Sequence, residues 1–119
     1  MPQVIIRMKA LSEKRMELLQ TVVSLIGYIR SEKGCRRCDF YQNVEDENEL
    51  CLLEEWDTEE NLIKHLKSEY FMIFRGAMTL LKEPYGMMLY TVFHPAGMEM
   101  FNLRKDCWPD NSGEPAIKP

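Results

Sequence analysis

The chain has 119 residues, a length that suits one domain and is too short for two. Its 45% hydrophobic content is enough for one core, and its net charge of -4 argues against nucleic acid as the main partner, since phosphate binding needs a basic face. No apolar run approaches the roughly 20 residues that span a bilayer, and the first residues lack the pattern of a secretory signal. We therefore expect a cytoplasmic protein with no membrane partner.

The first third of the chain predicts a strand and a helix. Residues 3–9 are rich in β-branched side chains, which favours a strand. Ser12 offers an N-cap for the helix, Gly27 is expected to allow a close helix–sheet contact, and Gly34 is expected to end the helix. The apolar stripe predicted for this helix consists of Met16, Leu19, Val23, Ile26 and Ile29, widened by Val22 and Leu25.

The middle of the chain predicts a hairpin followed by two short helices. Residues 37–44 and 49–56 are the expected strands, joined by the acidic stretch 45–48. Asp57 or Thr58 is expected to cap the first helix and Ser68 the second. The apolar positions of these helices are Leu62, Ile63 and Leu66 in the first, and Phe71, Phe74, Met78 and Leu81 in the second.

A fourth strand over residues 87–93 completes the order β-α-β-β-α-β, with the second helical segment split in two. That order is typical of the α+β ferredoxin-like fold, a four-stranded antiparallel sheet with helices on one face. We expect this domain to span residues 1–95. Residues 96–119 are expected to form a C-terminal extension that is partly mobile and can pack on a partner subunit.

Apolar residues occupy both faces of the predicted strands. One face carries Val4, Ile6 and Met8, then Leu50, Leu52 and Trp56, then Met87, Leu89 and Phe93, while the other carries Ile5, Cys51, Leu53, Met88, Tyr90 and Val92. Helices can cover only one face, and an open apolar face of that size favours a second copy packed sheet to sheet. We therefore expect a homodimer; the alternative is that some of these residues merely lie at sheet ends.

Residues 54–66 read EEWDTEENLIKHL and resemble the antibiotic biosynthesis monooxygenase superfamily, including the quinol monooxygenases of the YgiN type. In that family a strand ends in Glu-x-Trp, a helix follows, and a histidine lies about two turns in; the matching residues are Glu54, Trp56 and His65. Gly34 and Cys35 resemble the family's Pro-Gly-Cys turn, with a lysine in place of the proline. The resemblance covers residues 3 to about 93 and implies a dimeric α/β barrel.

The resemblance implies oxygenases that work without metal, flavin or haem, so no cofactor is expected. Their substrate, a small aromatic quinol or polyphenol, loses a proton and then supplies the electrons to oxygen itself. The protein has to bind an apolar aromatic molecule, help to remove a proton and exclude water. Haem-degrading relatives carry an axial histidine in the stretch that corresponds to residues 70–75, where this chain has Arg75 and no histidine.

His65 and Glu54 are the candidate catalytic residues. His65 can act as a base or hydrogen-bond partner because imidazole titrates near neutral pH, or it can tie the helix to a strand carbonyl or to Glu54. Glu54 lies in an otherwise apolar strand, so its carboxylate must be paired or have a raised pKa. It can orient His65 or a substrate hydroxyl; the interpretation that we favour is an ion pair with Arg7 or Lys9.

The candidate substrate-binding residues are aromatic, although aromatics at helical spacing are more often simply core. They are Trp56, Phe71, Phe74, Tyr90 and Tyr41. Cys35 and Cys38 form a C-x-x-C pair that can be a redox dithiol, or a metal site completed by Cys51 or His65. The pair does not open a helix and has no second C-x-x-C, so structural cysteines are the favoured interpretation.

Three functions follow from these residues. The first is a cofactor-independent monooxygenase, with His65 assisting proton removal beside an aromatic pocket. The second is a non-catalytic dimeric barrel that binds an apolar small molecule or acts in a stress response. The third is a thiol redox sensor built on Cys35 and Cys38.

Overall fold

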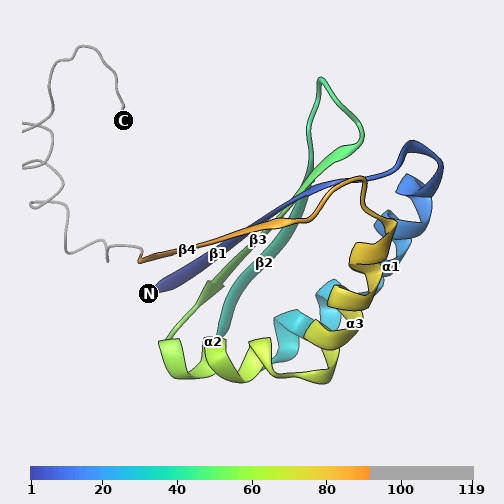
Figure 1. Ribbon diagram of the computed structural model, residues 1–119. Helices are drawn as coiled ribbons and strands as arrows, with labels where there is room; N and C mark the ends of the chain where they lie inside the picture. The colour runs from blue at the N-terminus through green and yellow to red at the C-terminus, as the bar shows by residue number, and fades with distance from the viewer. Residues whose placement is uncertain (92–119) are drawn as a thin grey trace, which may run out of the picture.

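The computed structural model describes residues 1–91, and its elements follow the predicted order (Figure 1). The strands form one antiparallel sheet in the order β2-β3-β1-β4, which confirms the α+β ferredoxin-like fold. The predicted domain boundary at residue 95 and the extension over 96–119 lie outside the described residues. The elements are β1 (Pro2–Lys9), η1 (Ser12–Lys14), α1 (Arg15–Ser31), β2 (Cys35–Gln42), β3 (Glu49–Trp56), α2 (Glu59–Leu66), α3 (Glu69–Ala77), η2 (Met78–Leu80) and β4 (Gly86–Thr91).

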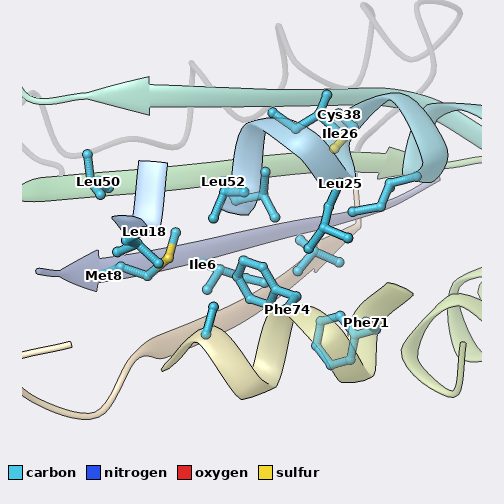
Figure 2. Packing of buried hydrophobic residues seen from close by; sticks show 14 of the residues in the cluster. Ile6, Met8, Leu18, Leu25, Ile26, Cys38, Leu50, Leu52, Phe71 and Phe74 are labelled. Atoms are coloured by element: carbon cyan, nitrogen blue, oxygen red, sulfur yellow. The ribbon is translucent and has the colours of Figure 1, made fainter. Parts of the chain in front are cut away.

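The helices lie on one side of the sheet, with α1 and α3 side by side and α2 at one end of the strands (Figure 1). The core fills the layer between them, where the removal of apolar side chains from water stabilises the fold. Within residues 1–91, no helix has the length and apolar character that a membrane span requires. Figure 2 shows this core, in which the labelled sheet residues Ile6, Met8, Cys38, Leu50 and Leu52 face Leu18, Leu25 and Ile26 of α1 and Phe71 and Phe74 of α3.

The predicted faces of β1 and β3 are confirmed. Val4, Ile6 and Met8 alternate with half-buried or exposed neighbours, and so do the buried residues of β3. On β4, Met87 and Leu89 pair with the helix-facing residues Ile6 and Val4, yet both are exposed. The helices therefore do not cover this edge strand within the described residues. Val92 and Phe93 of the predicted strand lie outside that part of the chain.

The predicted stripe of the first helix is wrong in part. Ser12 begins the short turn η1 and caps nothing, and α1 starts only at Arg15. Met16 and Val23 are exposed, and Gly27 faces open space, so it serves no close helix–sheet contact. The stretch has more apolar residues than one helix face can bury, and the sheet selects a stripe rotated from the predicted one. The residues buried in α1 are Leu18, Val22, Leu25, Ile26 and Ile29.

The predicted caps of the two short helices are confirmed. The Thr58 side chain accepts a hydrogen bond from the Asn61 amide at 3.1 Å, and Ser68 accepts one from the Phe71 amide at 3.2 Å. Because each cap fixes where its helix begins, α2 is limited to about two turns between β3 and α3. His65 lies in the last of these turns and points into the interior.

Gly34 makes the turn between α1 and β2, with a φ of 89° that favours glycine. Its carbonyl accepts a hydrogen bond from the Asp57 amide at 2.8 Å. A Cβ at this position would collide with the side chains of Asp57 and Asn61. The turn can therefore lie directly against the start of α2 only because residue 34 has no side chain.

We expect Gly34→Ala to destabilise the protein by at least about 1–2 kcal/mol, because the left-handed backbone disfavours a Cβ and the collision adds to that cost. Gly27→Ala is the matched control. It lies on an exposed helix face with open space around it and should stabilise by about 0.5–1 kcal/mol. Urea unfolding curves measure both changes. A Gly34→Ala protein as stable as the wild type would contradict this account of the turn.

Candidate functional site

His65 is held between two carboxylates. Its Nδ1 lies 2.6 Å from Oε1 of Glu32, and its Nε2 lies 3.1 Å and 3.2 Å from the two carboxylate oxygens of Glu54. Glu32 comes from the turn after α1, Glu54 from β3 and His65 from α2. We call these three residues the Glu32–His65–Glu54 network. It joins three elements that are far apart in the sequence.

Aromatic rings surround the imidazole. The Trp56 ring stacks on His65 with centroids 4.6 Å apart, and Phe71 meets it edge-on at 5.3 Å. The indole Nε1 of Trp56 also donates a hydrogen bond of 2.9 Å to Glu54. Glu54 and His65 are 0% and 1% exposed, so water does not solvate their charges. These contacts take the place of water around the buried polar groups.

The geometry favours two protons on His65. An ionised carboxylate only accepts hydrogen bonds, so an imidazole that bonds an ionised carboxylate at each nitrogen donates from both, which is the charged imidazolium form. Burial lowers the pKa of His65, but the hydrogen bonds and charges of Glu54 and then Glu32 outweigh it, so the pKa is raised overall. With both carboxylates ionised and His65 in the imidazolium form, the network has a net charge of -1.

The favoured interpretation of Glu54 is wrong. Lys9 pairs instead with Asp46 at 3.2 Å, and Arg7 pairs in register with Cys51, on the face of the sheet away from the helices. Glu54 contacts His65, which was the alternative. Glu32 was not among the predicted site residues. No local pattern pointed to it, because Glu32 lies 33 residues before His65 in the chain.

Only part of the predicted aromatic pocket comes together. Trp56 and Phe71 are buried against His65, and Phe74 is buried against Phe71. Tyr41 and Tyr90 are each 46% exposed and pair with Cys51 and Gln3, which places them on the face away from the helices. The structure therefore does not bring these two tyrosines to His65.

Residues 1–91 line hollows that include two near the predicted site residues. One, of about 470 Å³, lies between α2 and the β4 edge and is lined in part by Leu62, Leu66, Leu89 and Tyr90. It adjoins the helix that carries His65. The other, of about 500 Å³, lies at the opposite end of the sheet, and its lining includes Tyr41. The first hollow has the size of a small-molecule site, and its lining combines apolar side chains with the polar Asp57, Thr58 and Glu59.

The cysteines are poor candidates for redox or metal chemistry. A bulge after Cys35 places Cys35 opposite Trp56 and Cys38 opposite Glu54, so both thiols lie on the helix face, whereas Cys51 lies on the other. Burial and then the charge of Glu54 raise the pKa of Cys35 to about 11, and the same causes raise the pKa of Cys38. Within residues 1–91, no three His, Cys, Asp or Glu side chains are arranged to hold a metal ion.

The comparisons with known proteins agree with this fold. The sequence profile of the family "Antibiotic biosynthesis monooxygenase" matches residues 1–76, which is more than half of the chain. The chain therefore belongs to the antibiotic biosynthesis monooxygenase family. No curated protein matches it.

Solved structures repeat the fold. A conserved protein from Methanosarcina mazei Go1 is 29% identical with a TM-score of 0.73, over 77% of this chain and 92% of that one. Rv0793 from Mycobacterium tuberculosis is 26% identical with a TM-score of 0.74, over 80% and 97%. A putative antibiotic biosynthesis monooxygenase from Nitrosomonas europaea, at 18% identity and a TM-score of 0.75 over 79% and 100%, shares the fold alone.

The raised pKa of His65 predicts a pH-dependent stability. Because this pKa lies above its unfolded value, the stability that His65 contributes is fully present below about pH 6.5 and is lost as pH rises through the folded pKa. His65→Gln should cost about 3–5 kcal/mol at pH 6, since it leaves two carboxylates without their cation. Urea unfolding of the wild type and of His65→Gln from pH 6 to 10 measures the difference between their free energies of unfolding. This difference should narrow with rising pH. A difference that stays constant would contradict the charged form.

Proposed function

We propose that the protein is a monooxygenase of the YgiN type, which oxidises a small aromatic quinol or polyphenol with molecular oxygen and needs no cofactor. The observation that carries this proposal is the buried network with its net negative charge, enclosed by aromatic rings. Taking up one proton makes the network neutral, and a neutral group is favoured in a dry interior. The network can thus accept the proton that a quinol has to lose.

The remaining chemistry belongs to the substrate. Once deprotonated, the quinol passes an electron to oxygen, and the two radicals recombine away from bulk water. One oxygen atom enters the ring and the other leaves as water, so the quinol becomes a hydroxyquinone and supplies every electron. His65 assists the proton removal together with Glu54, while Trp56 and Phe71 exclude water around them.

The hollow beside α2 is the substrate site in this proposal. Its walls include Leu62 and Leu66, which come just before and after His65 in the helix, and Leu89 and Tyr90 on β4. These side chains suit a flat apolar molecule with a few hydroxyl groups. Tyr90 is therefore a candidate substrate contact by way of this hollow, whereas Tyr41 lies at the other one.

A homodimer in the cytoplasm completes the proposal. The sheet face away from the helices carries Ile5 and Leu53 as half-buried neighbours, with Met88 exposed beside them. A second copy packed face to face would cover these side chains and form the α/β barrel. The extension over residues 96–119 is proposed to pack on that partner.

A second candidate function is a barrel that binds an apolar small molecule without turnover. The observation that favours it is the closure of the site, because both ring nitrogens of His65 are occupied and the ring is 1% exposed. Such a protein would be stabilised by its ligand. It would consume no oxygen.

Oxygen uptake separates these two functions. We expect the purified protein, with a metal chelator and no added cofactor, to consume oxygen with at least one member of a panel of quinols and polyphenols. Glu54→Gln and His65→Gln should lower the rate by about 10²–10⁴-fold, the usual loss when acid–base assistance is removed. The other histidine provides the control, His94→Gln. Uptake no faster than with heat-denatured protein across the panel would overturn the enzyme proposal.

The dimer has its own test. Light scattering after gel filtration should give twice the 14.1 kDa chain mass for the wild type. Leu53→Arg should shift the protein to the monomer, because it places a charge in the middle of the proposed interface. Val44→Arg is the matched control, since Val44 is fully exposed in the β2–β3 hairpin. A wild-type protein that is monomeric at all concentrations would contradict the proposal.

A further inference from the structure

Glu32 is where the buried network reaches the surface. Its side chain is 17% exposed, whereas those of His65 and Glu54 are 0% and 1% exposed. It is therefore the member of the network that water can contact. Its hydrogen bond to Nδ1 of His65 is also the shortest in the network, at 2.6 Å.

The α1–β2 turn holds Glu32 in place. The Glu32 amide donates a hydrogen bond to the carbonyl of Ile29 at 3.0 Å, at the end of α1. The Glu32 carbonyl accepts a hydrogen bond from the Cys35 amide at 3.1 Å, at the start of β2. Gly34 lies between these bonds and docks the turn against Asp57 at the start of α2. The backbone of Glu32 is thus fixed against the helix that carries His65. The position of its carboxylate at the His65 ring is therefore set by the turn.

We propose that Glu32 is a positioning residue of this site, which keeps His65 doubly protonated, gives the network its net negative charge and exchanges its protons with water. The part of this role that concerns turnover rests on the proposed monooxygenase function. Without Glu32, an imidazolium and Glu54 would form a neutral pair. Taking a proton from a quinol would then create a buried positive charge, which the dry interior disfavours.

No other charged side chain described in residues 1–91 takes over the role of Glu32. From β2, Cys35 and Cys38 are neutral thiols at neutral pH because their pKa values are raised. Arg30 of α1 is bound to Asp39 and to the Cys38 carbonyl. From α3, the ring neighbour is the uncharged Phe71. The ion pairs of the described residues include no lysine or arginine on either glutamate of the network.

The titration of the His65 ring tests this role. The chain has two histidines, so carbon–proton NMR spectra of the imidazole rings contain two sets of signals, and His94→Gln assigns them. We expect Glu32→Gln to lower the pH at which His65 titrates by about one unit or more, since an opposite charge in contact has gone. Glu32→Asp keeps the charge but shortens the side chain by one methylene. In this variant His65 should titrate between its pH in the wild type and its pH in Glu32→Gln. Glu45 is an exposed glutamate in the hairpin, and in Glu45→Gln the His65 ring should titrate at the wild-type pH.

Titration of His65 at the wild-type pH in both Glu32 variants would overturn the proposal. The intermediate Glu32→Asp value separates lost charge from a disturbed fold and keeps the test valid if Glu32→Gln fails to fold. With a quinol substrate, Glu32→Gln should lower kcat by about tenfold or more, short of the loss expected for the acid–base group itself, and should leave KM unchanged. A wild-type protein that oxidises no quinol would end the monooxygenase proposal, and the titration alone would then decide the role of Glu32.

Discussion

The contact of His65 with two carboxylates is the constraint around which this domain is arranged. A charge removed from water is tolerated only when partners satisfy it, and here the partners come from the turn after α1 and from β3, while the ring comes from α2. The three elements must therefore meet within hydrogen-bond distance. The glycine turn at residue 34, the Thr58 cap and the short α2 together bring these elements into contact.

The network also sets what the domain can do. Apolar packing would hold the helices on the sheet equally well, and a buried ion pair is by itself weak evidence for stability. In the proposed function, the network adds a proton acceptor with a net negative charge, next to aromatic rings and shielded from water. Proton removal in a dry aromatic setting is what an oxygenase without a cofactor requires of its protein. The hollow between α2 and β4 is lined by other residues of the helix that carries His65 and by a strand that the described helices leave uncovered.

Much of the fold could be predicted from the sequence, because local patterns determine it. The alternation in β1 and β3 and the caps at Thr58 and Ser68 gave the correct elements. The stripe of α1 was misplaced, since the apolar arc of that helix is wider than the part that the sheet covers. The pairing of Glu54 was also misjudged: lysine and arginine neighbours on β1 were visible in the sequence, but the histidine lies 11 residues away on a helix. Glu32 is 33 residues from His65, and no local pattern reports such a contact. The position of Tyr41 and Tyr90 away from His65 could not be read from the sequence either, because the strand register places them on the other face.

The central claim is that His65 carries two protons because a carboxylate faces each of its nitrogens. Nitrogen NMR of the labelled wild-type protein at neutral pH tests it directly, by counting the hydrogens bonded to the ring. The account predicts a one-bond hydrogen coupling on both Nδ1 and Nε2 of His65. A ring with one bare nitrogen at that pH would contradict it, because at least one of the two carboxylates would then lack the proton that the geometry assigns to its hydrogen bond.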